Sequence, residues 1–292
     1  MRFHFYKMHG CGNDFLVLDY MKEEDPVPMK KLEVEYLCDR NFGVGADGLV
    51  ILSKSMHAAA KWRFYNSDGS SAEMCGNAAR CAIRFLSDHY FPEEELLSIE
   101  TDVGIIKGKK LDNDGLTEIT LMPGGGDNQL EPIEHTLRFN DDALRVYSIN
   151  TGVPHAVIEV PDIKAYPILE VGKFLRSHSV FGAGGTNVTY YQKLVGQQLL
   201  STTFERGVEG ETFACGTGAA AAAVVYAQLY MQPLPVVVTV PGGELTVDMS
   251  PVARRLLLRG PAEYVTEVLM EDLYQGYEKR NLFSKRELVD ET

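Results

Sequence analysis

The chain has 292 residues, of which 45% are hydrophobic and 24% are charged, a balance typical of a folded globular protein with one large or two ordinary domains. The formal net charge of −13 argues against nucleic acid or an anionic membrane surface as the main partner. No apolar run approaches the ~20 residues that span a bilayer, and the N-terminal residues lack the apolar region of a signal peptide. We therefore expect a cytoplasmic protein.

The residue pattern of the first half of the chain predicts short strands separated by glycine-rich turns. A short helix is expected at residues 30–38, and a second helix begins directly after Cys75, because apolar residues recur with helical spacing at positions 78, 82, 85 and 86. Three consecutive glycines make residues 123–132 the best linker candidate. Strands are predicted at residues 3–8, 15–19, 49–52, 61–65, 97–101, 104–107 and 116–122.

The second half of the chain repeats the first at a fixed distance. A shift of 140 residues places Cys75 and Gly76 on Cys215 and Gly216, and the same shift superimposes glycines, aromatic residues and turns in other segments. Coincident cysteines, turns and strands at one offset indicate two copies of one unit. We therefore expect two similar lobes, each with many short strands and one buried helix.

Cys215 lies at the start of a continuous apolar stretch. The residues from Ala219 to Ala227 are small or apolar on every side, which is typical of a buried helix. The first N–H groups of a helix have no partners within it, so this terminus suits an anion. The helix dipole should also lower the pKa of the Cys215 thiol toward a usable thiolate at neutral pH.

Two such helices, packed about a pseudo-twofold axis, would bring Cys75 and Cys215 to face each other across a cleft. The free N–H groups of both helix starts would then converge on one carboxylate and stabilise the charge that develops when the α-proton leaves. One thiol on each side of the carbon inverts the centre. The pattern predicts two-base racemisation or epimerisation without a metal or a cofactor. The N–H groups expected to hold the carboxylate belong to Gly76, Asn77, Gly216 and Thr217.

The cysteine count gives no sign of a disulfide framework. The five cysteines are odd in number and sparse, and they lack the C-x-x-C pairs of zinc and redox sites. We interpret Cys11, Cys38 and Cys81 as small packing residues.

Three strings of the sequence resemble the signatures of the diaminopimelate epimerases: MHGCGNDF at residues 8–15, EMCGNAARC at 73–81 and ERGVEGETFACGTGA at 205–219. The resemblance runs from residue 3 to about residue 270. It implies an α+β fold of two pseudo-symmetric lobes, each a mostly antiparallel β-barrel around a central helix. The N-terminal lobe would comprise residues 1–122 plus about 265–272, the C-terminal lobe residues 123–264, and a charged tail residues 273–292.

The resemblance also implies the conversion of LL-diaminopimelate to the meso form, for lysine and peptidoglycan synthesis, by a cofactor-independent homodimer. It makes Cys75 and Cys215 the acid–base pair, with Glu205 assisting Cys215 and lying at the substrate, and His155 assisting Cys75. Arg206 can bind a carboxylate through two hydrogen bonds. The residues that would hold the distal amino-acid end are Asn13, Asn66, Asn187 and Arg206.

Three positions depart from the family pattern. Val153 replaces the asparagine of a Gly-Asn-Pro-His string, Gly48 stands where many members have glutamine, and Ala78 replaces a frequent glycine. The change at position 78 only strengthens a helix. Val153 removes a side-chain amide from the substrate side, and could therefore widen specificity.

Other functions are compatible with parts of the sequence. Gly216–Ala221 loosely resembles a dinucleotide fingerprint, but it lacks the preceding apolar strand and the acidic residue about 20 positions later. A thiol hydrolase that pairs Cys215 with His155 would leave Cys75 and the duplication unexplained, and a non-catalytic binding protein would have no need of both thiols. A racemase of another amino acid, with the same two thiols, stays open.

Overall fold

The computed structural model describes residues 3–22, 29–72, 74–121, 130–251 and 255–270. The predicted lobe boundary at residue 122, most of the predicted linker and the charged tail of residues 273–292 lie outside the described residues. Within the described ranges, no helix is long and apolar enough to cross a bilayer.

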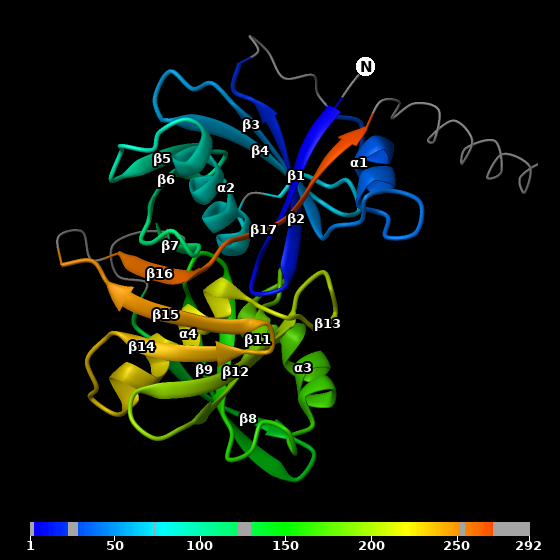
Figure 1. The fold of residues 1–292 in the computed structure, drawn as a ribbon. Helices are drawn as coiled ribbons and strands as arrows, with labels where there is room; N and C mark the ends of the chain where they lie inside the picture. Colours follow the sequence, from blue (N-terminus) through cyan, green and yellow to red (C-terminus); the bar gives the residue numbers. More distant parts are fainter. Residues whose placement is uncertain (1–2, 23–28, 73, 122–129, 252–254, 271–292) are drawn as a thin grey trace, which may run out of the picture.

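The N-terminal lobe is a mixed sheet that curls around one helix, α2 (Gly76–His89), as Figure 1 shows. The crossover helix α1 (Lys31–Cys38) links two parallel strands, β2 and β3, while α2 links the second parallel pair, β4 and β5. All other pairings of this lobe are antiparallel. Its strands are β1 (Phe3–Gly10), β2 (Asn13–Tyr20), β3 (Gly48–Ser53), β4 (Ala60–Asn66), β5 (Leu97–Thr101), β6 (Gly104–Lys110) and β7 (Leu116–Thr120).

The C-terminal lobe repeats this order. Its central helix is α4 (Gly216–Leu229) and its other crossover helix is α3 (Ile168–Arg176); the parallel pairs are β10 with β11 and β12 with β14. A short β13 (Gly210–Glu211) and a single 3₁₀ turn, η1 (Ser179–Phe181), are additions to the shared pattern. The repeating strands are β9 (Asp142–Asn150), β10 (Pro154–Glu159), β11 (Asn187–Lys193), β12 (Gln198–Glu205), β14 (Val236–Val240), β15 (Gly243–Met249) and β16 (Leu256–Pro261).

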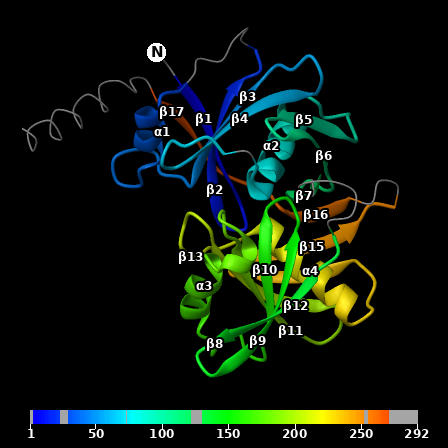
Figure 2. The same cartoon turned by 180° about the vertical axis from the view of Figure 1, so that it is seen from behind.

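The two lobes are joined through their last shared strands. β7 pairs with β16 in antiparallel register, from Thr120 opposite Leu257 to Leu116 opposite Pro261. Figures 1 and 2 show this pair between the upper and lower lobes from both sides. The chain then returns to the N-terminal lobe as β17 (Glu263–Met270), which pairs with β1, and β8 (Ile133–Phe139) pairs with β9 in the same way.

One inner core runs through both lobes. Its cluster of buried residues includes the apolar residues of α2 and α4 together with the strands around them. In α4 every residue from Gly218 to Tyr226 is buried, because alanine allows strands to pack on all sides of the helix. Two outer cores lie under α1 and α3. The predicted α+β fold, with two similar lobes and a mostly antiparallel sheet around each central helix, is confirmed.

Candidate active site

The amino ends of α2 and α4 meet at the junction of the lobes. The side chain of Leu258, on β16, lies against both helix starts: a Cβ placed on Gly76 would be 3.4 Å from its Cδ2 atom, and a Cβ placed on Gly216 only 2.7 Å. The side-chain amide of Asn77, in the first turn of α2, donates a hydrogen bond of 3.0 Å to the carbonyl oxygen of Ala214, immediately before the second cysteine. A larger residue at position 216 would therefore require the Leu258 side chain to move.

Cys75 and Cys215 occupy the N-cap positions of these helices. Both have extended backbone, with φ −144° and ψ 121° for Cys75 and φ −112° and ψ 104° for Cys215. Each carbonyl oxygen accepts the first helical hydrogen bond, of 2.9 Å, from residue 79 or 219. Both side chains are partly buried. The next N–H groups are directed toward the sulfurs, and they lower the pKa of each thiol.

Burial outweighs this effect of the helix ends. Desolvation raises the pKa of Cys75 to about 11, and it raises the pKa of Cys215 well above the usual value for a thiol. The sequence-based expectation of a lowered thiol pKa is therefore wrong, because loss of water disfavours the thiolate more than the helix dipole favours it.

Two amides lie beside Cys75, and two charged side chains act on its pKa: the carboxylate of Glu205 raises it and the guanidinium of Arg80 lowers it. The thiol donates to Oδ1 of Asn13 at 3.7 Å, and Nδ2 of Asn77 donates to the same oxygen at 3.0 Å. Nδ2 of Asn13 donates to Asp47 at 2.7 Å, which fixes the orientation of its amide. Arg80 lies one turn further along α2 and is fully buried.

The side chains around Cys215 are a hydroxyl and a carboxylate. The Cys215 sulfur lies 3.4 Å from Oγ1 of Thr217. Glu205, at the end of β12, accepts a hydrogen bond of 2.5 Å from Thr212 and acts on the Cys215 thiol. Burial raises the pKa of Glu205, and its charge raises the pKa of Cys215.

His155 is fully buried on β10 and is linked to Cys215, whereas the family resemblance assigns it to Cys75. Its Nδ1 atom lies 2.9 Å from Oγ1 of Thr189, and its Nε2 atom 3.0 Å from Oγ1 of Thr217, which in turn contacts the Cys215 sulfur. Burial lowers the pKa of His155 to about 3, so the ring is neutral. Since both ring nitrogens already have hydroxyl partners, His155 acts on this site through Thr217.

The four residues expected at the distal end of the substrate lie at or next to strand ends, and Asn13, described above, begins β2. Asn187 begins β11, and its Oδ1 accepts a hydrogen bond of 2.8 Å from the backbone N–H of Arg206, which follows β12. The Arg206 side chain is exposed and donates to the carbonyl oxygen of Gly184 at 3.3 Å. Asn66 ends β4 and donates to Ser70 at 3.0 Å.

The two departures near the substrate side have different structural settings. Val153 lies in the turn before β10, and a shift of 140 residues makes it the counterpart of Asn13. Gly48 pairs with Asn66, and a Cβ at this position would lie 2.7 Å from the carbonyl oxygen of Tyr65. A larger residue at position 48 therefore requires a shift of the backbone, whereas an asparagine at position 153 requires only a change of side chain.

Sequence reasoning did not assign a role to Arg80, Thr189 or Thr203. Thr189 and Thr203 extend the hydroxyl chain from His155, with 3.0 Å between their Oγ1 atoms. The 140-residue shift could have drawn attention to Arg80, because it aligns this arginine with Ala220, an uncharged residue of the second buried helix. Within the described residues, no group of three or more His, Cys, Asp or Glu side chains could hold a metal ion.

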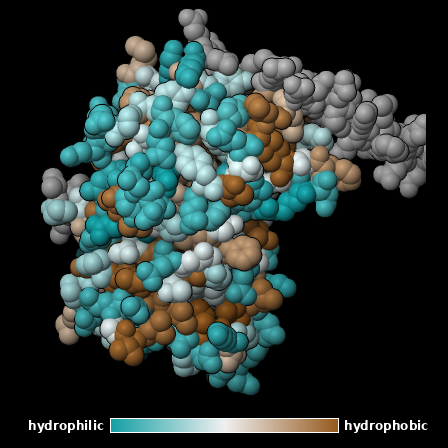
Figure 3. Space-filling view, in the orientation of Figure 1, coloured by the Kyte–Doolittle hydropathy of each residue, from teal (hydrophilic) through white to brown (hydrophobic). Residues whose placement is uncertain are grey.

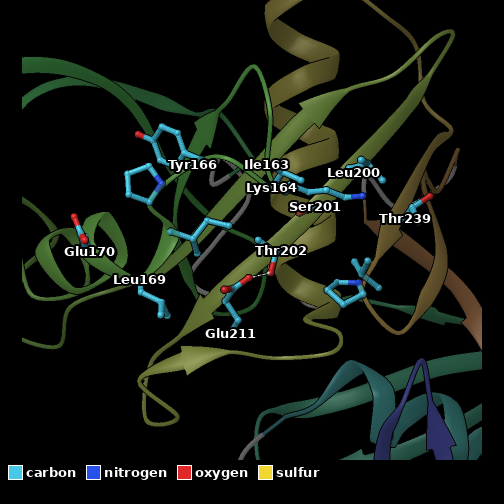
Figure 4. Close-up of a pocket in the computed structure, with 14 residues that line it drawn as sticks. Ile163, Lys164, Tyr166, Leu169, Glu170, Leu200, Ser201, Thr202, Glu211 and Thr239 are labelled. Atoms are coloured by element: carbon cyan, nitrogen blue, oxygen red, sulfur yellow. Dashed lines mark hydrogen bonds between the residues drawn. The ribbon is translucent and has the colours of Figure 1, made fainter.

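A pocket of about 730 Å³ lies elsewhere, on the outer surface of the C-terminal lobe. Figure 3 shows apolar residues gathered over this lobe, and Figure 4 shows the pocket between the start of α3 and strands β12 and β14. Its polar groups include Glu211, which accepts a hydrogen bond of 2.9 Å from Thr202. None of the predicted site residues lines this pocket, and it contains no thiol, so it is not the site of the proposed chemistry.

Comparisons with known proteins agree with this geometry. The family model described as diaminopimelate epimerase matches residues 5–125 and 147–265. Diaminopimelate epimerases from Aquifex aeolicus and Moorella thermoacetica are 37% and 38% identical over 275 and 274 residues; the matches cover 90% and 89% of this chain and 96% of each relative.

Solved structures share the fold at much lower identity. A putative phenazine biosynthesis protein from Clostridium difficile has a TM-score of 0.69 at 13% identity, and the match covers 92% of this chain and 99% of that one. A hydroxyproline epimerase from Agrobacterium vitis, with bound trans-4-hydroxy-L-proline, has a TM-score of 0.67 at 16% identity and 94% coverage of both chains. The family match and the identity to full-length relatives show that this chain belongs to the diaminopimelate epimerase family.

Proposed function

We propose that this protein is a cofactor-independent isomerase that converts LL-diaminopimelate to the meso form, a step that supplies lysine and peptidoglycan synthesis. The observation that carries the proposal is the meeting of two equivalent helix starts, each with a cysteine at its N-cap, which are joined through Leu258 and Asn77. The curated relatives named diaminopimelate epimerase support the choice of substrate.

The α-carboxylate of the substrate binds between the two helix starts. The N–H groups of Gly76 and Asn77 from α2, and of Gly216 and Thr217 from α4, lack partners within their helices and would donate to its oxygens. Negative charge that spreads onto this carboxylate when the α-proton leaves is then stabilised by fixed dipoles in a site with little water. No metal is needed for this step.

The proton transfer uses one thiolate and one thiol. The thiolate on one face takes the α-proton, so a C–H bond breaks and an S–H bond forms, and the electron pair stays on the substrate as an enolate-like carbanion. The thiol on the other face then gives its proton to the same carbon, so an S–H bond breaks and a C–H bond forms with inverted configuration. The roles of Cys75 and Cys215 exchange when the reaction runs in reverse.

The distal amino-acid end is held by the polar residues that flank the thiols. Arg206 is exposed and carries the planar fork that binds a carboxylate through two hydrogen bonds. Three asparagines and one carboxylate offer donors and acceptors to the remaining ammonium and carboxylate groups. These are Asn13, Asn66, Asn187 and Glu205.

A second candidate is the racemisation of another amino acid by the same two thiols. Val153 favours it, because the counterpart of this residue in the other lobe, Asn13, presents an amide beside the thiol. Structures with the same fold include a hydroxyproline epimerase and a probable proline racemase, so this architecture accommodates different substrates in other proteins.

We also propose that the protein acts in the cytoplasm as a homodimer, with a small amino acid rather than nucleic acid or a membrane as its partner. The family resemblance supports the dimer, and the net charge of −13 supports the choice of partner. Light scattering of the purified protein at several concentrations tests the dimer. A mass equal to one chain at all concentrations contradicts it.

The substrate is tested by exchange of the α-proton for deuterium in D2O. The purified protein is incubated separately with each diaminopimelate stereoisomer and with a panel of other amino acids, and incorporation is followed by mass spectrometry. We expect exchange with the LL and meso isomers at rates far above those of the panel. Exchange with another amino acid but not with diaminopimelate would overturn the substrate and retain the mechanism.

A further inference from the structure

Arg80 is a charged side chain in an unusual position. It lies on the second turn of α2 and is fully buried. The guanidinium donates to three neutral oxygens: Oδ1 of Asn77 at 2.8 Å, the carbonyl of Pro261 at 3.2 Å and the carbonyl of Gly76 at 3.5 Å. The ionisable groups that act on it most strongly are thiols, those of Cys11, Cys81 and Cys75. Burial of a cation without a carboxylate partner is unfavourable, so its presence calls for a function.

The surrounding strands are shaped to hold this guanidinium. A Cβ placed on Gly10, at the end of β1, would lie 2.8 Å from Nη2 of Arg80, and a Cβ placed on Gly260, in β16, would lie 3.3 Å from its Nε and Cζ atoms. Two glycines from strands far apart in the sequence thus leave the space that the arginine fills. The absence of side chains at Gly10 and Gly260 therefore leaves a space that fits the Arg80 guanidinium.

Arg80 also determines which way the Asn77 amide points. Arginine only donates hydrogen bonds, so the atom of Asn77 that faces it must be the oxygen. Nδ2 of Asn77 is therefore left to donate to Asn13 and to the carbonyl of Ala214, at 3.0 Å each. The Arg80 guanidinium thus orients the Asn77 side chain. That side chain joins Asn13, which contacts Cys75, to Ala214, which precedes Cys215.

The C-terminal lobe has no cation at the equivalent position. The counterpart of Arg80 in α4 is Ala220, which is also fully buried. The carboxylate of Glu205 instead acts on Cys215. The charged groups that face Cys75 are Arg80 from its own helix and Glu205 from β12; Asp47 in turn acts on Glu205. The carboxylate of Glu205 thus acts on both thiols, whereas the Arg80 cation acts on Cys75.

We propose that Arg80 is a positioning residue for the two-thiol reaction, which holds the Asn77 amide between the lobes and makes Cys75 lose its proton more readily than Cys215. The inference rests on the proposed function. Arg80 does not touch the substrate. It acts through Asn77 and through its positive charge beneath the first turn of α2.

The test is the rate of alkylation of each cysteine, measured in the absence of substrate at pH 7, 8 and 9. Wild type, Arg80→Met, Arg80→Lys and the control Arg84→Met are treated with iodoacetamide, and the labelling rates of Cys75 and Cys215 are resolved by peptide mass spectrometry. Arg84 lies one turn further along α2 and pairs with Asp88 at 2.7 Å, so the control removes a charge of the same helix away from the thiols.

Wild type should label Cys75 faster than Cys215 at each pH. In Arg80→Met we expect the labelling rate of Cys75 to fall about 10-fold, because a nearby cation favours the reactive thiolate, with a much smaller change for Cys215. In Arg80→Lys the charge is kept and the planar set of donors is lost, so the labelling rates should stay near those of wild type while kcat falls about 10-fold with little change in KM. Arg84→Met should leave both labelling rates unchanged.

An unchanged labelling rate of Cys75 in folded Arg80→Met, or equal decreases at both thiols, would overturn the proposal. If Arg80→Met does not fold, Arg80→Lys decides, because a decrease of about 10-fold at Cys75 despite the retained charge would also overturn it. Because the labelling needs no substrate, failure with diaminopimelate would leave this test intact.

Discussion

The starts of α2 and α4 have the same backbone and unlike side chains. Both helices place a cysteine at the N-cap and have 14 residues, and they begin at residues 76 and 216. Cys75 contacts the amide of Asn13 and lies near the buried cation Arg80, whereas Cys215 contacts a threonine and lies near the carboxylate of Glu205. The two lobes share the backbone geometry of the helix starts, but a buried cation acts on Cys75 alone while the carboxylate of Glu205 acts on both thiols.

This difference separates the two requirements of an epimerase. Inversion of a carbon needs two similar groups on opposite faces, and the repeated helices provide them. Recognition of an asymmetric substrate, and a defined protonation state for each thiol, need groups that differ between the lobes. Changes to the shared features should therefore abolish the reaction, whereas changes to the unlike flanks should adjust its rate, pH dependence and specificity.

The largest effect is expected from removal of either thiol. Cys75→Ala and Cys215→Ala should each lower turnover by about 1000-fold or more in both directions, because each removes a general acid–base group that the other cannot replace. Cys38→Ala is the matched control, since Cys38 lies buried in the outer core under α1. Chiral chromatography of the products measures the rates. Substantial activity in either single variant contradicts the symmetric role of the thiols.

A smaller loss is expected when the carboxylate beside Cys215 is neutralised. Glu205→Gln keeps an acceptor for Thr212 but removes the negative charge that raises the pKa of Cys215. We expect turnover to fall about 10- to 100-fold and alkylation of Cys215 to occur at lower pH than in wild type. This effect is opposite in sign to the slower labelling of Cys75 expected in Arg80→Met. If alkylation of Cys215 in Glu205→Gln requires the same pH as in wild type or a higher one, Glu205 does not raise the pKa of Cys215.

The burial of His155 in the C-terminal lobe should make the free energy of unfolding depend on pH. The pKa of His155 is about 3 in the folded protein, below the value of about 6.5 for an unfolded histidine, so the unfolded state binds a proton more readily as the pH falls from about 6.5 toward 3. The free energy of unfolding in urea should therefore decrease by about 2 kcal/mol more between pH 7.5 and 5.0 in wild type than in His155→Gln.

The N-terminal lobe offers a reference for this measurement. The counterpart of His155 at a shift of 140 residues is Phe15, which is buried and does not titrate. An equal pH dependence in wild type and His155→Gln would show that another group is responsible.

The smallest effect is expected at Val153. Val153→Asn restores the amide that Asn13 provides in the other lobe, and one additional hydrogen bond of about 1 kcal/mol should raise kcat/KM for diaminopimelate about 5-fold. Steady-state kinetics with diaminopimelate and with the best alternative amino acid would measure the change in preference. If the preference moves toward the alternative substrate, position 153 does not recognise diaminopimelate.

The sequence predicted the features that the two lobes share. Cys75 and Cys215 stood out because a rare residue type recurred at one offset with the same glycine after it, and all-apolar spacing correctly predicted the buried helix α4. Helix α3 (Ile168–Arg176) was absent from the prediction, because its apolar pattern is short and is interrupted by a glycine. The 140-residue shift of residues 30–38 gives residues 170–178, which overlap most of this helix.

The unlike flanks were harder to predict because they depend on packing between distant segments. An arginine on an amphipathic helix is normally exposed, and the burial of Arg80 follows from Gly10 and Gly260, which only the fold brings together. The link from His155 to Thr217 likewise joins β10 to α4 across 62 residues. The raised thiol pKa values reflect desolvation, which a sequence motif does not report.

The central claim, that two thiols act on opposite faces of one carbon, is tested most directly by the fate of the α-hydrogen. Wild-type protein is incubated with LL-diaminopimelate in D2O, and substrate and product are analysed by mass spectrometry and NMR at low conversion. The account predicts a meso product that carries solvent deuterium at the inverted carbon, while the remaining LL substrate keeps its hydrogen. A product that retains the hydrogen of the substrate, or a substrate that gains deuterium as fast as the product does, would contradict the two-thiol mechanism.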